Sequence, residues 1–238
     1  GYCIKDGQPS YDVKICFAQN EASGKPEVSF STEVPDAVYF TTDGKEPTKE
    51  SAVYTKPIEV TQSTTVKARM YRPDGSMGRV ASQDIHFHKA LGKKVAYKIP
   101  YSPKHDGGGD YAMTNGMLGK WQGVEKSGAD FTIYLGSVQD INMIESNWKY
   151  DIMDWVLRPT EVKYSVSADG KNFTQVHVEK FENTPYDFGV GTIVVNFKKL
   201  VPDVRYIRVQ ASSQKTNPKW HSSAGAACWI FVDEVQVK

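Results

Sequence analysis

Asp130-Phe-Thr-Ile-Tyr-Leu135 alternates polar and apolar side chains with a period of two. This alternation is typical of a β-strand with one face in a core and the other in water. The pattern returns in segments rich in Val, Ile, Thr and Tyr, which are favoured in strands. They are residues 11–17, 28–30, 37–40, 65–71, 80–87, 161–167, 192–197, 205–211 and 229–237.

Turn-forming pairs such as Asp43-Gly44, Asn115-Gly116 and Asp169-Gly170 separate these segments. No amphipathic stretch of ten or more residues predicts a helix, so we expect an all-β fold of packed sandwiches. Residues 88–94 are polar, contain a glycine and lie between two sets of strands. They predict a linker between domains at residues 1–90 and 91–238. The first length suits an immunoglobulin-like sandwich and the second a jelly roll.

The composition excludes several classes of partner. The 238 residues carry 29 basic and 28 acidic side chains, which argues against nucleic acid or an anionic membrane held by bulk charge. No apolar run approaches the ~20 residues that a membrane helix needs, so we expect no membrane insertion. The cysteines are Cys3, Cys16 and Cys228, without a CxxC pair. Buried free thiols and a Cys3–Cys16 disulfide both remain open, and an odd count leaves at least one thiol free.

The first half contains a specific run of motifs. Val38-Tyr-Phe-Thr-Thr-Asp-Gly-Lys-Glu-Pro-Thr48 is followed by Tyr54-Thr-Lys-Pro-Ile58 and Thr64-Thr-Val-Lys-Ala-Arg69. The run describes a strand, an Asp-Gly turn fixed by Pro47, and a returning strand. It resembles the chitobiase/β-hexosaminidase C-terminal domain over about residues 25–87. That resemblance implies a small immunoglobulin-like sandwich.

The second half carries a longer series of weaker motifs. They are Gly107-Gly-Gly-Asp-Tyr-Ala-Met-Thr-Asn-Gly116, Trp121-Gln-Gly123, Asp130–Gly136, Trp155-Val-Leu-Arg-Pro159, Val166-Ser-Ala-Asp-Gly-Lys-Asn-Phe173 and Tyr206-Ile-Arg-Val-Gln-Ala211. Together they resemble the factor V/VIII C-type (discoidin) domain, also classed as carbohydrate-binding module family 32, over about residues 95–238. The resemblance implies a discoidin-type jelly-roll β-sandwich that binds glycans on loops at one end.

The C-terminal motifs indicate a parent enzyme. Pro218-Lys-Trp-His221 and Trp229-Ile-Phe-Val-Asp-Glu-Val235 resemble the modules appended to bacterial glycoside hydrolase family 20 β-N-acetylhexosaminidases. Similar tails occur on some α-L-fucosidases. The resemblance implies a periplasmic or secreted bacterial protein, with GlcNAc- or Gal-containing glycans and the parent's catalytic domain as partners.

We expect no active site in this segment. Family 20 enzymes use an adjacent Asp-Glu pair in a (β/α)₈ barrel of about 250 residues. The only such pair is Asp233-Glu234, inside the last expected strand, so we expect the catalytic part to precede Gly1. Two functions stay open for this non-catalytic fragment. It binds glycan and supports the catalytic domain, or its two modules only pack on that domain and have no sugar site.

Loop aromatics give the candidate sugar contacts, because sugar rings stack their apolar faces on aromatic planes while polar side chains bind the hydroxyls. Three expected loops qualify, at residues 145–151, 183–189 and 216–222. The candidates are Trp148, Tyr150, Arg158, Tyr186, Trp220 and His221. Trp121, Trp155 and Trp229 are assigned to the core. Exposure of Trp148, Tyr186 and Trp220 would favour binding, and burial would favour packing.

A structural calcium ion is a further implication of the resemblance. Many modules of this family hold calcium near an ALxDG turn, with a late Glu completing the ligand set. The turn here reads Ala112-Met-Thr-Asn-Gly116, so Asn115 replaces the usual Asp. Loss of a carboxylate lowers calcium affinity. The candidate ligands are Asp110, Asn115 and Glu234; alternatively, Asn115 only shapes the turn and Glu234 pairs with a cation.

Overall fold

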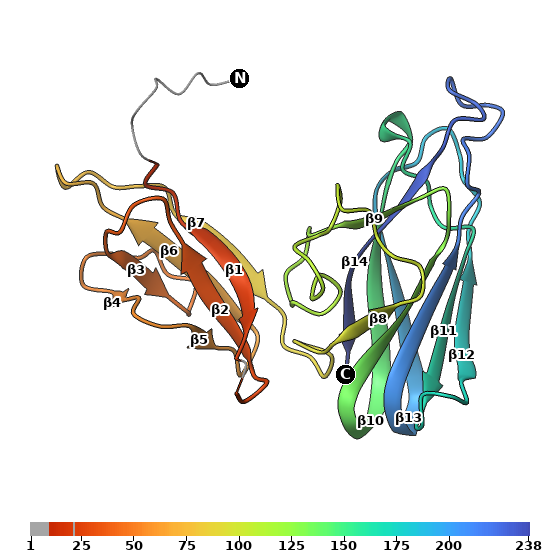
Figure 1. Cartoon of the computed structure of the whole chain (residues 1–238), viewed down its shortest axis with the longest axis horizontal. Coiled ribbons are helices and arrows are strands. Elements are labelled where there is room, and N and C mark those ends of the chain that lie inside the picture. The colour runs from red at the N-terminus through yellow and green to blue at the C-terminus, as the bar shows by residue number, and fades with distance from the viewer. Residues whose placement is uncertain (1–9, 21) are drawn as a thin grey trace. The chain divides into compact units, whose positions relative to one another are not determined.

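A computed structural model describes residues 10–20 and 22–238 (Figure 1). The chain divides into two compact units, with the boundary between Phe87 and His88. Apart from one short 3₁₀ turn, the regular structure of the described residues consists of β-strands. Within that part of the chain, no helix has the length and apolar character needed to span a membrane. Cys3 lies outside the described residues, and so does the Cys3–Cys16 disulfide that the sequence leaves open; Cys16 is a free thiol.

The first unit contains two antiparallel sheets. One has the order β1-β2-β5 and the other β4-β3-β6-β7. Apolar side chains from both sheets share one core, including Val13, Phe30, Val38 and Met70. The strands are β1 (Lys14–Gln19), β2 (Pro26–Ser31), β3 (Val38–Thr41), β4 (Ala52–Val53), β5 (Ile58–Glu59), β6 (Thr64–Met70) and β7 (Ala81–Ile85). This is the sandwich that the sequence predicts for the first half.

The Asp43-Gly44 turn closes β3 in the expected way. Gly44 has a φ of 78°, a conformation that residues with a Cβ rarely adopt. Its N–H donates to the Thr65 carbonyl of β6 at 3.1 Å, and the Asp43 carboxylate accepts the Lys45 N–H at 3.1 Å. The motif therefore ties the turn to the neighbouring strand.

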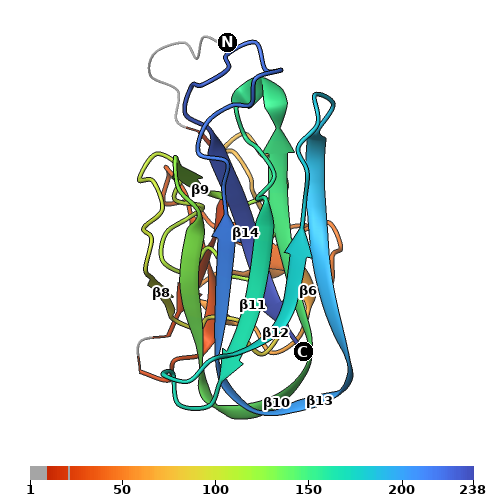
Figure 2. The ribbon, with the colours of Figure 1, turned by 90° about the vertical axis from the view of Figure 1, so that its right-hand side faces the viewer.

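The second unit is a larger sandwich (Figure 2). Its strands run in the order β12-β11-β13-β10-β14-β9, and β8 also pairs with β10. The elements are β8 (Val95–Tyr97), β9 (Gln122–Glu125), β10 (Ala129–Asp151), the 3₁₀ turn η1 (Ile152–Asp154), β11 (Glu161–Ser167), β12 (Thr174–Lys180), β13 (Phe188–Ser212) and β14 (Trp229–Val237). All the strand pairings are antiparallel.

Strands β10 and β13 run through both layers of this sandwich. Their register shifts between Tyr134 and Met143. The first part of β10 pairs with β8, and the part from Ile144 onward pairs with β14. Apolar side chains of both parts meet in one core, among them Phe131 and Ile144. The sequence predicts two strands at 192–197 and 205–211, and the structure joins them in β13.

Residues 145–151 correct a prediction, because the expected loop is the end of β10. Polar side chains obscured the alternation. Ser146 is fully buried, where its hydroxyl accepts the Trp148 indole N–H at 2.9 Å and bonds to the Tyr164 hydroxyl. Asn147 is also buried and accepts a hydrogen bond from the Thr192 hydroxyl at 2.7 Å. Partners distant in the sequence therefore allow polar residues inside this strand.

The segment 88–94, which we expected to be a linker, is instead part of the second unit. Ala90 and Leu91 are buried in that unit. His88 is buried too, and its Nε2 lies 2.7 Å from Glu234 Oε1. The Lys89 N–H donates to the Val237 carbonyl at 2.8 Å. The sequence suggests a solvated connector because charged side chains stand at each end of this segment.

Candidate functional site

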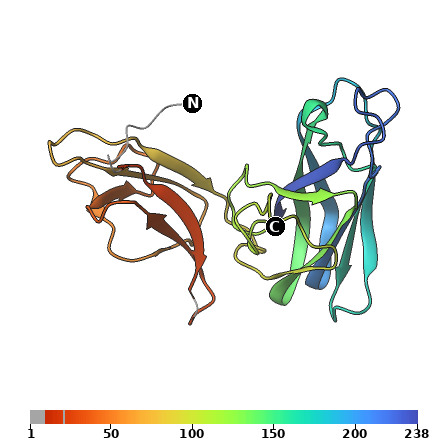
Figure 3. The same ribbon diagram turned by 45° about the horizontal axis from the view of Figure 1, so that its top comes forward.

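Three segments of the second unit meet at one end of its sandwich. They are the η1 turn, the 181–187 connection and the 213–228 loop. The His221 Nε2–H donates to the Ile152 carbonyl at 2.8 Å, and the Ile152 N–H donates to the Asp187 carbonyl at 3.3 Å. Figures 2 and 3 show η1 (green) and the 213–228 loop (dark blue) at the same end. We call this region the loop end.

The loop end presents large apolar side chains to solvent. Tyr186 is 92% exposed and Phe188 77% exposed. The side chains of Met153, Trp155 and Trp220 are exposed as well. Isolated exposed apolar residues are ordinary, whereas several at one end of a domain make that end a candidate interaction surface.

Trp155 corrects the prediction that it packs in the core. Its φ of 62° lies in the left-handed region, which is uncommon outside glycine and frequent at functional sites. Its N–H donates to the Ile152 carbonyl at 3.1 Å, and its carbonyl accepts the Trp229 N–H at 2.9 Å. The backbone is therefore fixed on both sides while the indole stays exposed. Trp121 and Trp229 are half-buried.

A small pocket lies beside the exposed aromatics. Its volume is about 140 Å³, and Trp148, Tyr150, Arg158 and Phe181 are among the residues that line it. The Arg158 guanidinium carbon lies 3.9 Å from the centroid of the Tyr150 ring, which is a cation–π contact. Three predicted sugar contacts, Trp148, Tyr150 and Arg158, thus share one pocket.

Asp187 connects this pocket to the exposed Tyr186. One of its carboxylate oxygens lies 3.3 Å from Arg158 Nη2. The other accepts the Thr184 N–H at 2.9 Å. The Arg158 N–H in turn donates to Asn183 Oδ1 at 2.8 Å. The segment that carries Tyr186 is therefore fixed to the pocket by side-chain bonds.

Two of the predicted sugar contacts are buried. Trp148 is only 2% exposed and belongs to the main core, with one edge at the pocket. Its neighbour Tyr164 is fully buried, and burial raises the pKa of that phenol to about 12. His221 is buried and bonds to the η1 backbone, so it braces the loops. By the exposure criterion these two residues pack, whereas Tyr186 and Trp220 present free surface.

Phe188 is a candidate contact that the sequence analysis did not name. It follows Tyr186 by two residues, and both flank Asp187, which pairs with the pocket residue Arg158. Two aromatic residues at a spacing of two, around one charged residue, is a signal that could have been used. Trp155 gave no such signal, because its exposure depends on a left-handed backbone conformation.

The three expected calcium ligands are bonded to other groups. Asp110 Oδ1 accepts the Tyr101 hydroxyl at 2.9 Å, and Asn115 Oδ1 accepts the Met117 N–H at 2.7 Å within its own turn. Glu234 pairs with His88. Within the described residues, no group of three or more His, Cys, Asp or Glu side chains could hold a metal. As arranged, these side chains do not form a calcium cage, and the calcium site stays a prediction.

The His88–Glu234 pair is shielded from solvent on both sides. Burial lowers the pKa of His88 to about 3, and its Nδ1 accepts the Ala90 N–H at 3.2 Å. The imidazole is therefore neutral and donates from Nε2 to Glu234. Burial also raises the pKa of Glu234 well above its usual value, against the opposing effect of the Gly116 amide.

Family models match both units. The chitobiase/beta-hexosaminidase C-terminal domain matches residues 17–82. The F5/8 type C domain matches residues 98–227, which is more than half of the chain. The chain belongs to the F5/8 type C domain family. Its F5/8 type C domain therefore follows a chitobiase/beta-hexosaminidase C-terminal domain, in the order that the sequence motifs indicate. No curated protein matches the chain.

Solved structures resemble part of the chain. Chitosan-binding module 1 of a chitosanase/glucanase from Paenibacillus sp. IK-5 is 18% identical, with a TM-score of 0.44; the match covers 64% of this chain and 99% of that one. The CBM32 of AlyQ, in complex with 4,5-unsaturated mannuronic acid, is 18% identical, with a TM-score of 0.41 and coverages of 60% and 92%. CBM32-1 from a Clostridium perfringens family 31 glycoside hydrolase is 15% identical, with a TM-score of 0.41 and coverages of 61% and 92%.

Proposed function

We propose that the F5/8 type C domain binds glycan chains at the loop end. The observation that carries the proposal is the group of exposed aromatic side chains, led by Tyr186 and Phe188, beside the Arg158–Asp187 pair. Aromatic rings offer flat apolar surfaces on which sugar rings stack, and the charged pair offers a donor and an acceptor for hydroxyl groups. Free aromatic faces beside fixed polar groups are what this kind of recognition needs.

Arg158 is the residue best prepared to orient a sugar. Stacking on Tyr150 and pairing with Asp187 fix its guanidinium before any ligand arrives. A fixed side chain loses less conformational entropy on binding than a free one. Its Nε is buried and has no hydrogen-bond partner among the described residues.

The role of such a domain is to hold substrate near an enzyme. Linkage to a catalytic domain raises the effective local concentration of a weakly bound chain. The motifs at Trp220-His221 and Asp233-Glu234 support a bacterial β-N-acetylhexosaminidase as the parent, with an α-L-fucosidase as the alternative. In this proposal the protein is periplasmic or secreted, the first unit is a spacer, and the glycan contains GlcNAc or Gal.

Titration with GlcNAc- and Gal-terminated oligosaccharides, followed by calorimetry, tests the proposal. We expect weak binding, and we expect Tyr186→Ala or Trp220→Ala to lower the affinity about tenfold, which corresponds to the ~1.4 kcal/mol of one stacking contact. Leu200→Ala is a control, because Leu200 is exposed on β13 outside the loop-end segments. Absence of binding at millimolar ligand would favour modules that only pack on the catalytic domain.

A further inference from the structure

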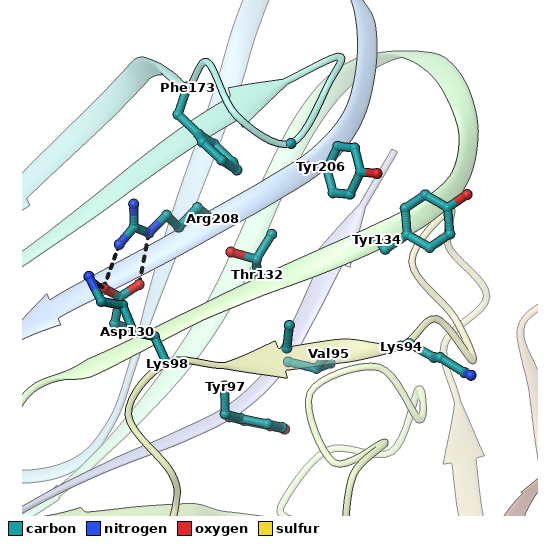
Figure 4. Close-up of a pocket in the computed structure, with 12 residues that line it drawn as sticks. Lys94, Val95, Tyr97, Lys98, Asp130, Thr132, Tyr134, Phe173, Tyr206 and Arg208 are labelled. Carbon is teal, nitrogen blue, oxygen red and sulfur yellow. Dashed lines mark hydrogen bonds and ion pairs between the residues drawn. The ribbon is translucent and has the colours of Figure 1, made fainter.

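The F5/8 type C domain has a second concave surface, on the outer face of one of its layers. It is a groove of about 720 Å³ over β8, β10 and β13 (Figure 4), within the usual range for ligand pockets. The alternation of each strand produces it. Phe131 and Ile133 enter the core, so Asp130, Thr132 and Tyr134 point outward into the groove. We call this surface the sheet groove.

Aromatic side chains form one end of the sheet groove. The rings of Tyr134 and Tyr206 lie 5.2 Å apart at an interplanar angle of 31°. Arg205 Nη2 donates to the Tyr134 hydroxyl at 2.7 Å, which holds that ring. Figure 4 shows both tyrosines on neighbouring strands, and it shows Phe173 near Arg208. Such rings offer the surface on which sugars stack.

Three cationic side chains also line the groove. Lys94, Lys98 and Arg208 line the groove with a single carboxylate, that of Asp130. The lining charges therefore sum to an excess of two positive charges, although the formal charge of the whole chain is only +1. The concentration of cations at one aromatic surface does not follow from the overall composition.

The arginine in this groove is fixed in place. Asp130 accepts hydrogen bonds from Arg208 Nε at 2.8 Å and Nη2 at 2.7 Å, and a third from Gln210 Nε2 at 3.2 Å. The Phe173 ring lies 5.9 Å from the Arg208 guanidinium carbon. These contacts hold the guanidinium plane, so its Nη1 edge is available to a ligand with little ordering cost.

We propose that the sheet groove is a second carbohydrate-binding site, and that its ligand is an anionic polysaccharide carrying carboxylate or sulfate groups. Ring stacking on Tyr134 and Tyr206 suits the sugar, and Lys94, Lys98 and Arg208 suit its acid groups. None of the groove's lining residues lines the loop-end pocket. The two sites are therefore separate, and this one stands without the function proposed for the loop end.

The test uses the whole chain and three probes: oligogalacturonate for carboxylate, a chondroitin sulfate oligosaccharide for sulfate, and a neutral oligosaccharide of equal length. We expect one or both anionic probes to bind more tightly than the neutral one, and the affinity to fall with added salt. The double substitution Lys94→Gln/Lys98→Gln is expected to lower anionic affinity at least tenfold. Tyr206→Ala is expected to lower it several-fold at any salt concentration. If the lysine substitutions weaken binding of only one anionic probe, that result would support the site and identify its acid group as carboxylate or sulfate.

The matched control is Lys198→Gln/Lys199→Gln, which removes the same charge from exposed residues of β13 outside the groove. Equal weakening by both double variants would overturn the proposal, because net charge alone would then explain the binding. Failure of both anionic probes to bind would overturn it as well. A Tyr186→Ala variant that loses neutral-sugar binding but keeps anionic binding separates failure of one site from failure of the other.

Discussion

The loop end and the sheet groove are two aromatic surfaces of one sandwich, and they differ in how their rings are held. At the loop end Tyr186 and Phe188 are largely exposed, and the neighbouring Arg158 and Asp187 form an ion pair whose charges cancel. In the sheet groove the rings are half-buried among cations that outnumber the carboxylate. In our proposal, aromatic side chains therefore serve a different ligand at each site, because their neighbours decide the charge of what can bind.

The comparison also separates the residues that stabilise the fold from those that we propose contact a ligand. Residues that point into the core fix the positions of those that point out, as Phe131 does for Thr132 in β10. At the loop end, the same division runs between buried Trp148 and exposed Tyr186. Substitutions on the two sides of this division are expected to change different measurements.

The largest expected effect is the difference in stability loss between a buried and an exposed aromatic residue of the loop end. Trp148→Ala removes a core indole, so we expect the free energy of unfolding to fall by about 3–5 kcal/mol. Tyr186→Ala removes a solvated ring, and stability should change by less than about 0.5 kcal/mol. Urea unfolding of both variants measures the difference. Equal stability losses would contradict the assignment of Trp148 to the core and of Tyr186 to the solvent-exposed surface.

The next effect concerns the carboxylate of the sheet groove. Burial raises the pKa of Asp130, but the hydrogen bonds and charge of Arg208 outweigh burial and hold that pKa below its usual value. A carboxyl with a lowered pKa stabilises the fold above its unfolded pKa, near 3.8, and this contribution is lost as pH falls through the folded pKa. Asp130→Asn should therefore cost about 2 kcal/mol at pH 7 and progressively less below about pH 4.

Unfolding by urea at pH 7 and at pH 3 compares Asp130→Asn with the wild type. Asp154→Asn is the control, since Asp154 is an exposed acid of η1 at the loop end, and it should leave stability unchanged at both pH values. A stability loss for Asp130→Asn that is the same at pH 7 and pH 3 would contradict the ion pair as its cause.

The smallest expected effect comes from Gly170, which lines the sheet groove next to Tyr206. Gly170 has a φ of 74°, and a Cβ there would lie 3.0 Å from the Tyr206 ring. Gly170→Ala should cost about 1 kcal/mol and displace Tyr206, which lowers groove affinity and leaves the loop end unchanged. Gly24→Ala is the control: its φ is 66°, with nothing within 4 Å of an added Cβ. If Gly170→Ala binds anionic chains as the wild type does, Tyr206 is not a contact.

The sequence predicted the architecture well, because alternation marks the face of each strand directly. The direction of Asp130, Thr132 and Tyr134 follows from it without a structure. The sheet groove did not follow, because its lining comes from three strands that are distant in the sequence. The strand at 145–151 was missed since burial of Ser146 depends on Tyr164, which only the fold brings close.

The candidate site was predictable in part for the same reason. Trp148, Tyr150 and Arg158 meet in one pocket as proposed contacts, but the burial of Trp148 and the exposure of Trp155 depend on backbone geometry. A left-handed φ at Trp155 cannot be read from its neighbours in the sequence. Aromatic content identified the regions, and only the structure separated packing residues from free surface.

One competition titration tests the central claim, that this sandwich carries two sites for two classes of glycan. The whole chain is first saturated with the neutral oligosaccharide that binds the loop end, and it is then titrated with the anionic chain that binds the sheet groove. The account predicts the same anionic affinity with and without the neutral ligand. Displacement of one ligand by the other would place both at a single site and contradict it.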